Sequence, residues 1–230
     1  MPRPPARRDR LGARECPGLR SVSDYPVSYS FLTGAVLTGT EVDADPPGAN
    51  NFKCRPTSRH PRPVVLVHGT AGNKNTNSQT YAPLLANNGL LRLSLTYDVT
   101  TGTPKGPDQL GGMDRIETSA ARLRTFVNRV RSATGSAFMQ KMRKGGVAVK
   151  GITYSNIVTR YDELVSPYTS GIETGMRNIV VQGNCAGDYT EHFEIAVDPV
   201  AAGYVLNALD PAHPRPVSCT TVLPFEGPVT

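Results

Sequence analysis

Short apolar runs bounded by turn residues make up most of the hydrophobic pattern along this chain. The clearest run extends from Val64 to Val67, follows a proline and ends at His68-Gly69. Successive apolar residues cannot all face one side of a strand, so the run predicts a short strand buried on both faces, as in parallel sheets. Similar runs predict further strands at 90–97, 152–159 and 178–182.

The longest regular pattern predicts a helix at 114–134. Its apolar residues recur every three or four positions, which places them on one face and leaves the arginines on a solvated face. Asp114 and Glu117 provide a capping start, and Gly135 suits the end. The apolar residues are Ile116, Ala120, Leu123, Val127 and Val130, and the arginines are Arg115, Arg122, Arg124 and Arg129.

Two shorter helices and an extended segment complete the expected elements. A helix at 78–87 follows a polar loop and closes at Gly89, whereas residues 25–50 form an extended lead-in that ends in a turn. A last helix begins at Asp198-Pro199, where aspartate can cap it and proline suits its first position. Its inward-facing residues are expected to be Val205, Leu206 and Leu209. This order predicts an α/β fold with a mostly parallel sheet flanked by helices.

Composition fits one soluble domain over residues 25–230. The chain has 230 residues, 38% of them hydrophobic, and no apolar run near the roughly 18 residues that indicate a membrane span. It lacks tryptophan and is only 7% aromatic, which argues against a surface for stacking nucleic-acid bases. The first twenty residues carry a surplus of four positive charges out of the net charge of +6, and they belong to an Arg- and Pro-rich lead, residues 1–24, that we expect to be disordered and without a secretory signal.

The cysteines favour disulfides over a metal site. None of the four shows the C-x-x-C spacing of a zinc site. Disulfides imply export, which conflicts with the missing secretory signal. The four are Cys16, Cys54, Cys185 and Cys219.

Three residues, in the order that ester hydrolases use, form a candidate catalytic set. A strand that ends in His-Gly can present the next backbone N–H, here that of Thr70, to the oxyanion of a tetrahedral intermediate. Gly69 would let the backbone turn without a Cβ in the way. Asp162 follows a predicted strand, where a carboxylate can orient a histidine, and we prefer it to its neighbour Glu163. His192 comes after the acid, in a loop before the last helix, and is the candidate general base.

Several blocks of the sequence are similar to one enzyme family. The blocks are YPVSYSFLTGAVL, DPPGANNFKCRP, HPRPVVLVHGT, APLLANNG, TRYDELVSPYTS and LNALDPAHPRPVSCTTVLP. Across about residues 25–223 the chain resembles the secreted lipases and esterases of actinobacteria, in the class 2 lipase group of α/β-hydrolases. These enzymes hydrolyse carboxylic esters, including triacylglycerols, with a Ser-Asp-His triad and no metal or organic cofactor.

The resemblance implies specific roles in this chain. It implies Thr70 as oxyanion donor, Asp162 as triad acid and His192 as general base. It also implies a disulfide between Cys185 and Cys219 and a secreted, lipid- or ester-degrading protein. Cys54 is then either free or paired with Cys16.

One part of the family pattern is missing. The family places a strand, a G-H-S-x-G elbow with the nucleophilic serine, and a helix after the crossover helix, whereas this sequence passes from Gly135 directly to Ser136. No G-x-S-x-G occurs in the chain. We therefore expect an incomplete hydrolase fold, with an internal block absent near 135/136, and negligible ester hydrolysis.

Two other residues are candidates for the missing nucleophile, and each has a better interpretation. Cys185 lies in a G-x-C-x-G, but after the acid and seven residues before His192, so a disulfide is the better interpretation. Ser136 is a nucleophile candidate by position only, and a helix cap suits it better. Two alternatives to an esterase remain. One is a non-catalytic hydrolase-like protein or the product of an internal deletion or faulty gene model, and the other is a nucleic-acid-binding module that uses the arginine-rich lead.

Overall fold

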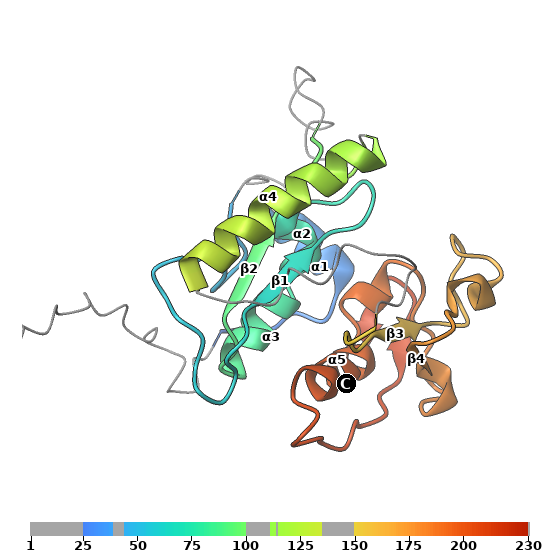
Figure 1. The fold of residues 1–230 in the computed structure, drawn as a ribbon. Helices are drawn as coiled ribbons and strands as arrows, with labels where there is room; N and C mark the ends of the chain where they lie inside the picture. Colours follow the sequence, from blue (N-terminus) through green and yellow to red (C-terminus); the bar gives the residue numbers. More distant parts are fainter. Residues whose placement is uncertain (1–24, 39–43, 100–110, 114, 135–149, 230) are drawn as a thin grey trace, which may run out of the picture.

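The computed structural model describes residues 25–38, 44–99, 111–113, 115–134 and 150–229. We call 25–134 the N-terminal half and 150–229 the C-terminal half. Each half contains one pair of parallel strands with helices beside it, so the predicted α/β character is confirmed at this coarse level (Figure 1). Residues 1–24, for which we expect disorder, lie outside the described residues.

The N-terminal half is built on β1 (Val64–Val67) and β2 (Arg92–Leu95), which pair in parallel with Val64 opposite Arg92. All four residues of β2 are buried, whereas β1 is only half-buried and Val67 is 45% exposed. The prediction that β1 is buried on both faces is therefore wrong. Within the described residues β1 pairs with β2 alone, so its other edge lacks the cover that a neighbouring strand provides.

The long helix α4 (Ile116–Thr134) is where the sequence predicts it. Val127 and Val130 are buried as expected, but Ala120 is exposed. The arginines are not all simply solvated. Arg122 forms an ion pair of 2.9 Å with the buried Asp98, and Arg129 lies 4.3 Å from the ring centroid of Phe52. Asp114 and Gly135, the expected ends, lie outside the described residues.

Among the described residues three helices precede α4, and each differs from the expectation in part. Residues 25–50 include α1 (Phe31–Thr38), which begins after Ser30, because the Ser30 hydroxyl accepts a hydrogen bond from the N–H of Thr33 at 3.3 Å. The expected polar loop contains α2 (Lys74–Ser78), which Asn73 caps. The predicted helix at 78–87 is reduced to α3 (Tyr81–Asn87), with Gly89 in a left-handed conformation after it, as expected.

The C-terminal half is built on β3 (Ser155–Val158) and β4 (Arg177–Val180), a second parallel pair within the two predicted runs. Helix α5 (Pro199–Leu209) packs beside them, and Asp198 caps it as predicted by accepting a hydrogen bond from the N–H of Ala201 at 2.5 Å. The face that it buries is not the expected one, because Leu209 is 36% exposed. Instead, the buried residues of α5 are Val200, Ala201 and Ala202.

A disulfide and a small apolar cluster form part of the C-terminal core. Cys185 and Cys219 form the disulfide that the family resemblance implies. Cys185 packs with Val181, Val200 and Ala201 in one apolar cluster. After the disulfide, β5 (Val222–Leu223) and β6 (Gly227–Pro228) form a short antiparallel hairpin.

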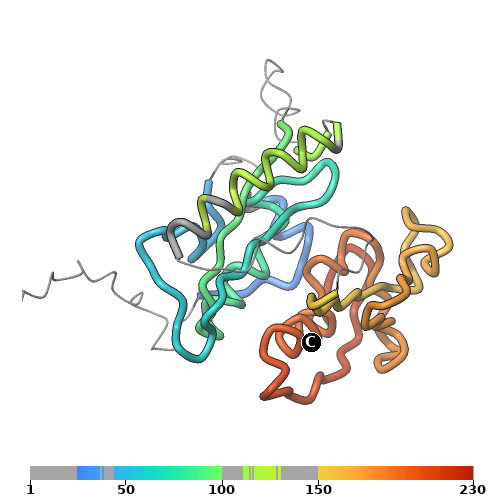
Figure 2. Tube along the Cα trace, in the orientation of Figure 1, coloured from blue at the N-terminus to red at the C-terminus, as the bar shows by residue number. Residues whose placement is uncertain are grey.

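The two halves lie side by side in the tube view (Figure 2). The ring of Phe31, at the start of α1, is 5.5 Å from that of Phe193, and the N–H of Phe31 donates to Glu194 at 3.3 Å. At a second contact, Arg215 donates to the side chain of Asn88 at 3.0 Å. Within the described ranges no strand pairing joins the two sheets, and no helix is long and apolar enough to cross a membrane.

Candidate functional site

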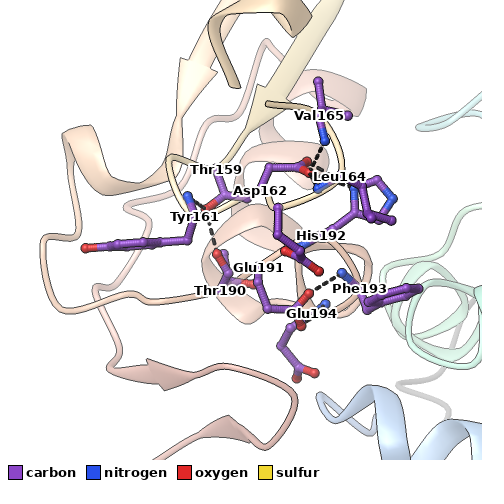
Figure 3. Close-up of polar contacts among 11 residues, drawn as sticks. Thr159, Tyr161, Asp162, Leu164, Val165, Thr190, Glu191, His192, Phe193 and Glu194 are labelled. Carbon is purple, nitrogen blue, oxygen red and sulfur yellow. Dashed lines mark hydrogen bonds and ion pairs between the residues drawn. The ribbon is translucent and has the colours of Figure 1, made fainter. Parts of the chain in front are cut away.

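Asp162 and His192 form a hydrogen-bonded pair between two loops of the C-terminal half (Figure 3). Asp162 lies in the loop after β3, and His192 precedes the 3₁₀ helix η5 (Glu194–Ala196). The Nδ1 atom of His192 lies 2.9 Å and 3.0 Å from the two carboxylate oxygens of Asp162. Because a carboxylate only accepts hydrogen bonds, Nδ1 is the protonated nitrogen and Nε2 is left to accept a proton.

The Asp162 carboxylate is held in its ionised form. Burial alone would raise its pKa, but hydrogen bonds from the N–H of Val165 and from His192 outweigh burial, and the pKa lies below the ordinary value for aspartate. The oxygen that accepts from Val165 at 2.7 Å also accepts from the N–H of Leu164 at 3.0 Å. These bonds fix the carboxylate before any substrate arrives, which is the preorganisation that proton-transfer catalysis requires.

A buried polar network joins the two loops of the pair. The hydroxyl of Thr159, which is fully buried, donates to the carbonyl oxygen of Thr190 at 2.6 Å. Gln182 donates to the Thr159 hydroxyl at 2.9 Å and to the carbonyl oxygen of Asp188 at 3.1 Å, and accepts from the N–H of Arg160 at 2.9 Å. The loop of Asp162 and the loop of His192 are therefore tied to one another and to the end of β4.

Two glutamates fix the backbone around His192. Glu191 accepts from the N–H of Phe193 at 2.6 Å and from that of Glu194 at 2.9 Å. Glu163, the neighbour of the candidate acid, accepts from the N–H of His192 at 3.3 Å. Its contact is with the backbone, whereas Asp162 contacts the imidazole, which agrees with the preference for Asp162.

Three buried carboxyl groups near the pair have raised pKa values. Burial raises the pKa of Glu194 to about 7, with a smaller contribution from the Glu191 charge, although the hydrogen bond from Phe31 opposes the shift. Burial and the neighbouring Asp188 raise the pKa of Asp198 to about 8. Burial also raises the pKa of Asp188 itself. One proton between the two carboxyls avoids placing two like charges in the core.

Thr70, the candidate oxyanion donor, lies in the other half of the molecule. It is exposed, and among the described residues its N–H has no hydrogen-bond acceptor. No hydrogen bond within the described ranges joins Thr70 to Asp162 or His192. The expectation for Gly69 is wrong, because a Cβ there would meet open space and the left-handed residue of the turn is Ala71.

The contacts of His68 are with its own half of the molecule and hold its ring in place. It is buried, stacks on Tyr97 with ring centroids 4.3 Å apart, and its Nε2 accepts from the N–H of Tyr97 at 3.1 Å. Its Nδ1 lies 2.7 Å from the carbonyl oxygen of Gly69, so Nδ1 carries the proton. Burial lowers the pKa of His68, which keeps the ring neutral.

No nucleophile accompanies His192 in the part of the chain that the structure describes. There, no serine, threonine or cysteine side chain forms a hydrogen bond with Nε2 of His192, and no cluster of acidic, histidine and cysteine side chains could hold a metal ion. Cys185 is in the disulfide and cannot attack an ester. Cys54 is also disulfide-bonded rather than free. Its expected partner Cys16 and the positional candidate Ser136 lie outside the described residues.

A cavity of about 470 Å³ lies beside the pair and was not predicted from the sequence. Its walls come from three loops that are far apart in the sequence, so no local pattern indicates it. Glu163 and Glu191, the neighbours of Asp162 and His192, are part of the wall. The complete lining is Tyr161, Glu163, Tyr189, Glu191, Pro224 and Phe225.

Comparisons with known proteins do not identify a family. No protein-family model matches the sequence, and no curated protein sequence matches it either.

Proposed function

We propose that this chain carries the acid–base half of a carboxylic ester hydrolase site, within an incomplete α/β-hydrolase fold of the actinobacterial secreted lipase and esterase type. The Asp162–His192 hydrogen bond supports the proposal most directly. The order of acid and histidine along the chain is that of the α/β-hydrolases. The Cys185–Cys219 disulfide is consistent with the secreted origin that the resemblance implies.

In this proposal His192 is the general base. Its Nε2 would take the proton of an attacking hydroxyl, and the ionised Asp162 would stabilise the resulting imidazolium. Asp162 already accepts two backbone N–H bonds, so it need not rearrange when the histidine becomes charged. Among the described residues the N–H of Thr70 has no acceptor and would suit an oxyanion, but Thr70 lies in the turn after β1 in the N-terminal half and can serve only if a further element joins the two halves at the site.

The same proposal predicts that the chain as it stands does not hydrolyse esters efficiently. The G-x-S-x-G elbow would supply the serine, a second oxyanion N–H and a strand of the sheet. The half-exposed Val67 and the separation of the two strand pairs are what the loss of such a strand would produce. Without the serine, the acid and base have nothing to activate except water.

The separated sheets also support a second candidate function, a hydrolase-like protein without catalysis or the product of an internal deletion. In either case an ester or lipid would be the substrate only of a complete parent protein. The coding DNA around Gly135 and Ser136 separates the candidates. An in-frame stretch that encodes a strand, G-x-S-x-G and a helix would establish that an active parent exists.

Restoration of the missing block tests the proposal. A variant with a strand, G-x-S-x-G and helix inserted between Gly135 and Ser136 should hydrolyse p-nitrophenyl butyrate, and His192→Ala or Asp162→Asn in that background should lower kcat by at least about 10³-fold. The unmodified chain should show no turnover above that of its own His192→Ala variant. If the folded insertion variant keeps its full activity without His192, the proposal is wrong.

A further inference from the structure

The cavity beside the pair is walled mainly by aromatic rings. Tyr161 and Tyr189 lie with ring centroids 5.4 Å apart at an angle of 43°, so their faces diverge rather than stack. Phe225 provides the third ring, and its centroid is 6.3 Å from that of Phe193. All three wall residues are partly exposed, so a ligand can reach them.

The backbone positions of the three rings are fixed independently. The N–H of Tyr161 donates to the buried Thr159 hydroxyl at 3.2 Å, and the N–H of Tyr189 donates to the carbonyl oxygen of Val222 at 2.9 Å. Phe225 lies at the turn of the β5–β6 hairpin in a left-handed conformation, with φ of 62°. A cavity whose walls are fixed before binding pays little ordering entropy when a ligand enters.

Gly227 allows the β5–β6 hairpin to approach the backbone of Tyr29 closely. Its φ of 98° suits glycine, and a Cβ there would lie 2.5 Å from the carbonyl oxygen of Tyr29. The hairpin can therefore pack directly against the segment before α1.

The formal charge of the cavity wall is negative. Glu163 and Glu191 both line it, and its six described lining residues include neither lysine nor arginine. Both carboxylates are oriented by backbone N–H groups around His192. Glu191 is itself buried, with both carboxylate oxygens bonded to backbone N–H groups, so the exposed Glu163 provides the charge that a ligand would meet. An acyl chain would leave that charge uncompensated, whereas a cation would be attracted both to it and to the rings.

We propose that this cavity binds a quaternary ammonium group, such as the trimethylammonium of choline. Three aromatic rings and neighbouring carboxylates are the groups that recognise such cations, because methylated ammonium is large, weakly hydrated and drawn to ring faces. The volume of about 470 Å³ lies within the range of small-molecule sites, roughly 300–1,000 Å³. Binding needs no turnover, so the inference stands apart from the proposed catalytic function, although the ligand would lie next to Asp162 and His192.

Isothermal titration calorimetry of the full-length protein tests the proposal with two isosteric ligands. Choline carries the charge, and 3,3-dimethylbutan-1-ol has the same shape without it. Choline should bind at least about tenfold more tightly than the neutral alcohol. Equal affinities would overturn the proposal, because the cavity would then select shape alone, and so would failure of choline to bind.

Variants locate the binding and separate it from catalysis. Tyr161→Leu and Tyr189→Leu should each weaken choline binding about fivefold, and Glu163→Gln should weaken it about threefold. Tyr25→Leu is the matched control, because Tyr25 is 37% exposed but lies in the N-terminal half, and it should leave binding unchanged. His192→Ala should also retain binding. If Tyr161→Leu and Tyr25→Leu behave alike, choline binds elsewhere and the proposal is wrong.

The source of the ammonium group can be distinguished with lipid vesicles. If the natural ligand is a lipid headgroup, the protein should sediment with phosphatidylcholine vesicles but not with phosphatidylglycerol vesicles, and choline should compete. If the ligand is a free choline-type molecule, calorimetry should show binding while neither vesicle sediments the protein. Sedimentation with both vesicles that choline does not reduce would contradict recognition by this cavity.

Discussion

The two halves of the molecule contain the same motif, a parallel strand pair with helices beside it, but different cores. Among the described residues, the buried leucines all lie in the N-terminal half, where β2 is buried along its whole length. The buried hydrophobic residues of the C-terminal half include no leucine. Instead it buries four carboxyl groups, Asp188, Glu191, Glu194 and Asp198, whereas the described residues of the N-terminal half bury only that of Asp98.

The difference shows what each core is suited to do. Apolar burial stabilises the fold but is not directional. The leucine core therefore holds β1, β2 and α3 together without orienting any polar side chain. Hydrogen bonds are directional, and the network around Thr159 and Gln182 orients the loops that carry Asp162 and His192. The candidate acid and base therefore lie in the half whose core contains more buried polar groups and no buried leucine.

Removal of a buried leucine should show the largest effect on stability. Leu93 is fully buried in β2, and Leu93→Ala should lower the free energy of unfolding by about 4 kcal/mol, through lost burial and the cavity that remains. Chemical denaturation measures this. The exposed Leu164, changed to alanine as a control, should cost less than about 0.5 kcal/mol. Similar losses in both variants would contradict a leucine-dependent N-terminal core.

Removal of the disulfide should be the strongest perturbation of the C-terminal half. Cys185→Ala with Cys219→Ala should cost about 3 kcal/mol, because the bond closes a segment with a sequence separation of 34. Amide hydrogen exchange should show lost protection in β3, β4 and α5, while β2 keeps its own. Equal loss of protection in β2 would mean that the halves do not have separate cores.

The buried acids of the C-terminal half should make stability depend on pH. Glu194 has a folded pKa of about 7, above its unfolded value, so its protonated form is favoured by folding. This contribution is complete at low pH and is lost as the pH rises through 7, by on the order of 2 kcal/mol between pH 5 and pH 8. Asp198, with a pKa of about 8, acts in the same direction. Denaturation of Glu194→Gln across this range should show a flatter profile, and an unchanged profile would exclude Glu194 as a cause.

Disruption of the buried polar network around Thr159 should have the smallest effect on stability. Thr159→Val keeps the shape of the side chain but removes one of the hydrogen bonds of Gln182 and the hydroxyl that donates to the carbonyl oxygen of Thr190, which should cost about 1.5 kcal/mol. The Nδ1 proton resonance of His192 in the NMR spectrum should broaden as the loop loosens. Thr125→Val is the matched control, because its exposed hydroxyl contacts only a carbonyl oxygen of its own helix. A sharp, unshifted His192 resonance in Thr159→Val would show that the network does not position the pair.

The sequence predicted those features that depend on local pattern. All four parallel strands, α4 and the Asp198 cap of α5 follow from apolar runs, helical spacing and capping residues. The resemblance implied the disulfide, which the structure confirms, and it selected the two residues that are found hydrogen-bonded, Asp162 and His192. The catalytic roles of these two residues remain predictions.

Other features depended on contacts that a local pattern does not contain. The cap at Ser30 is a signal for α1 that was overlooked, whereas exposure of β1 depends on which strand is its neighbour. The large residues of α5 predict its inward face, but the helix buries Val200, Ala201 and Ala202 instead, and Ala201 packs in one cluster with Cys185 of the disulfide. The aromatic cavity combines three distant loops, so only the folded chain reveals it.

Covalent labelling with a fluorophosphonate is the most direct test of the central claim, that an ordered acid–base pair is present without its nucleophile. Purified full-length protein should show no hydroxyl labelled above the level of its His192→Ala variant when the products are mapped by mass spectrometry. Labelling of a single serine or threonine that disappears in His192→Ala would contradict the claim, because it would show that the chain already contains an activated nucleophile.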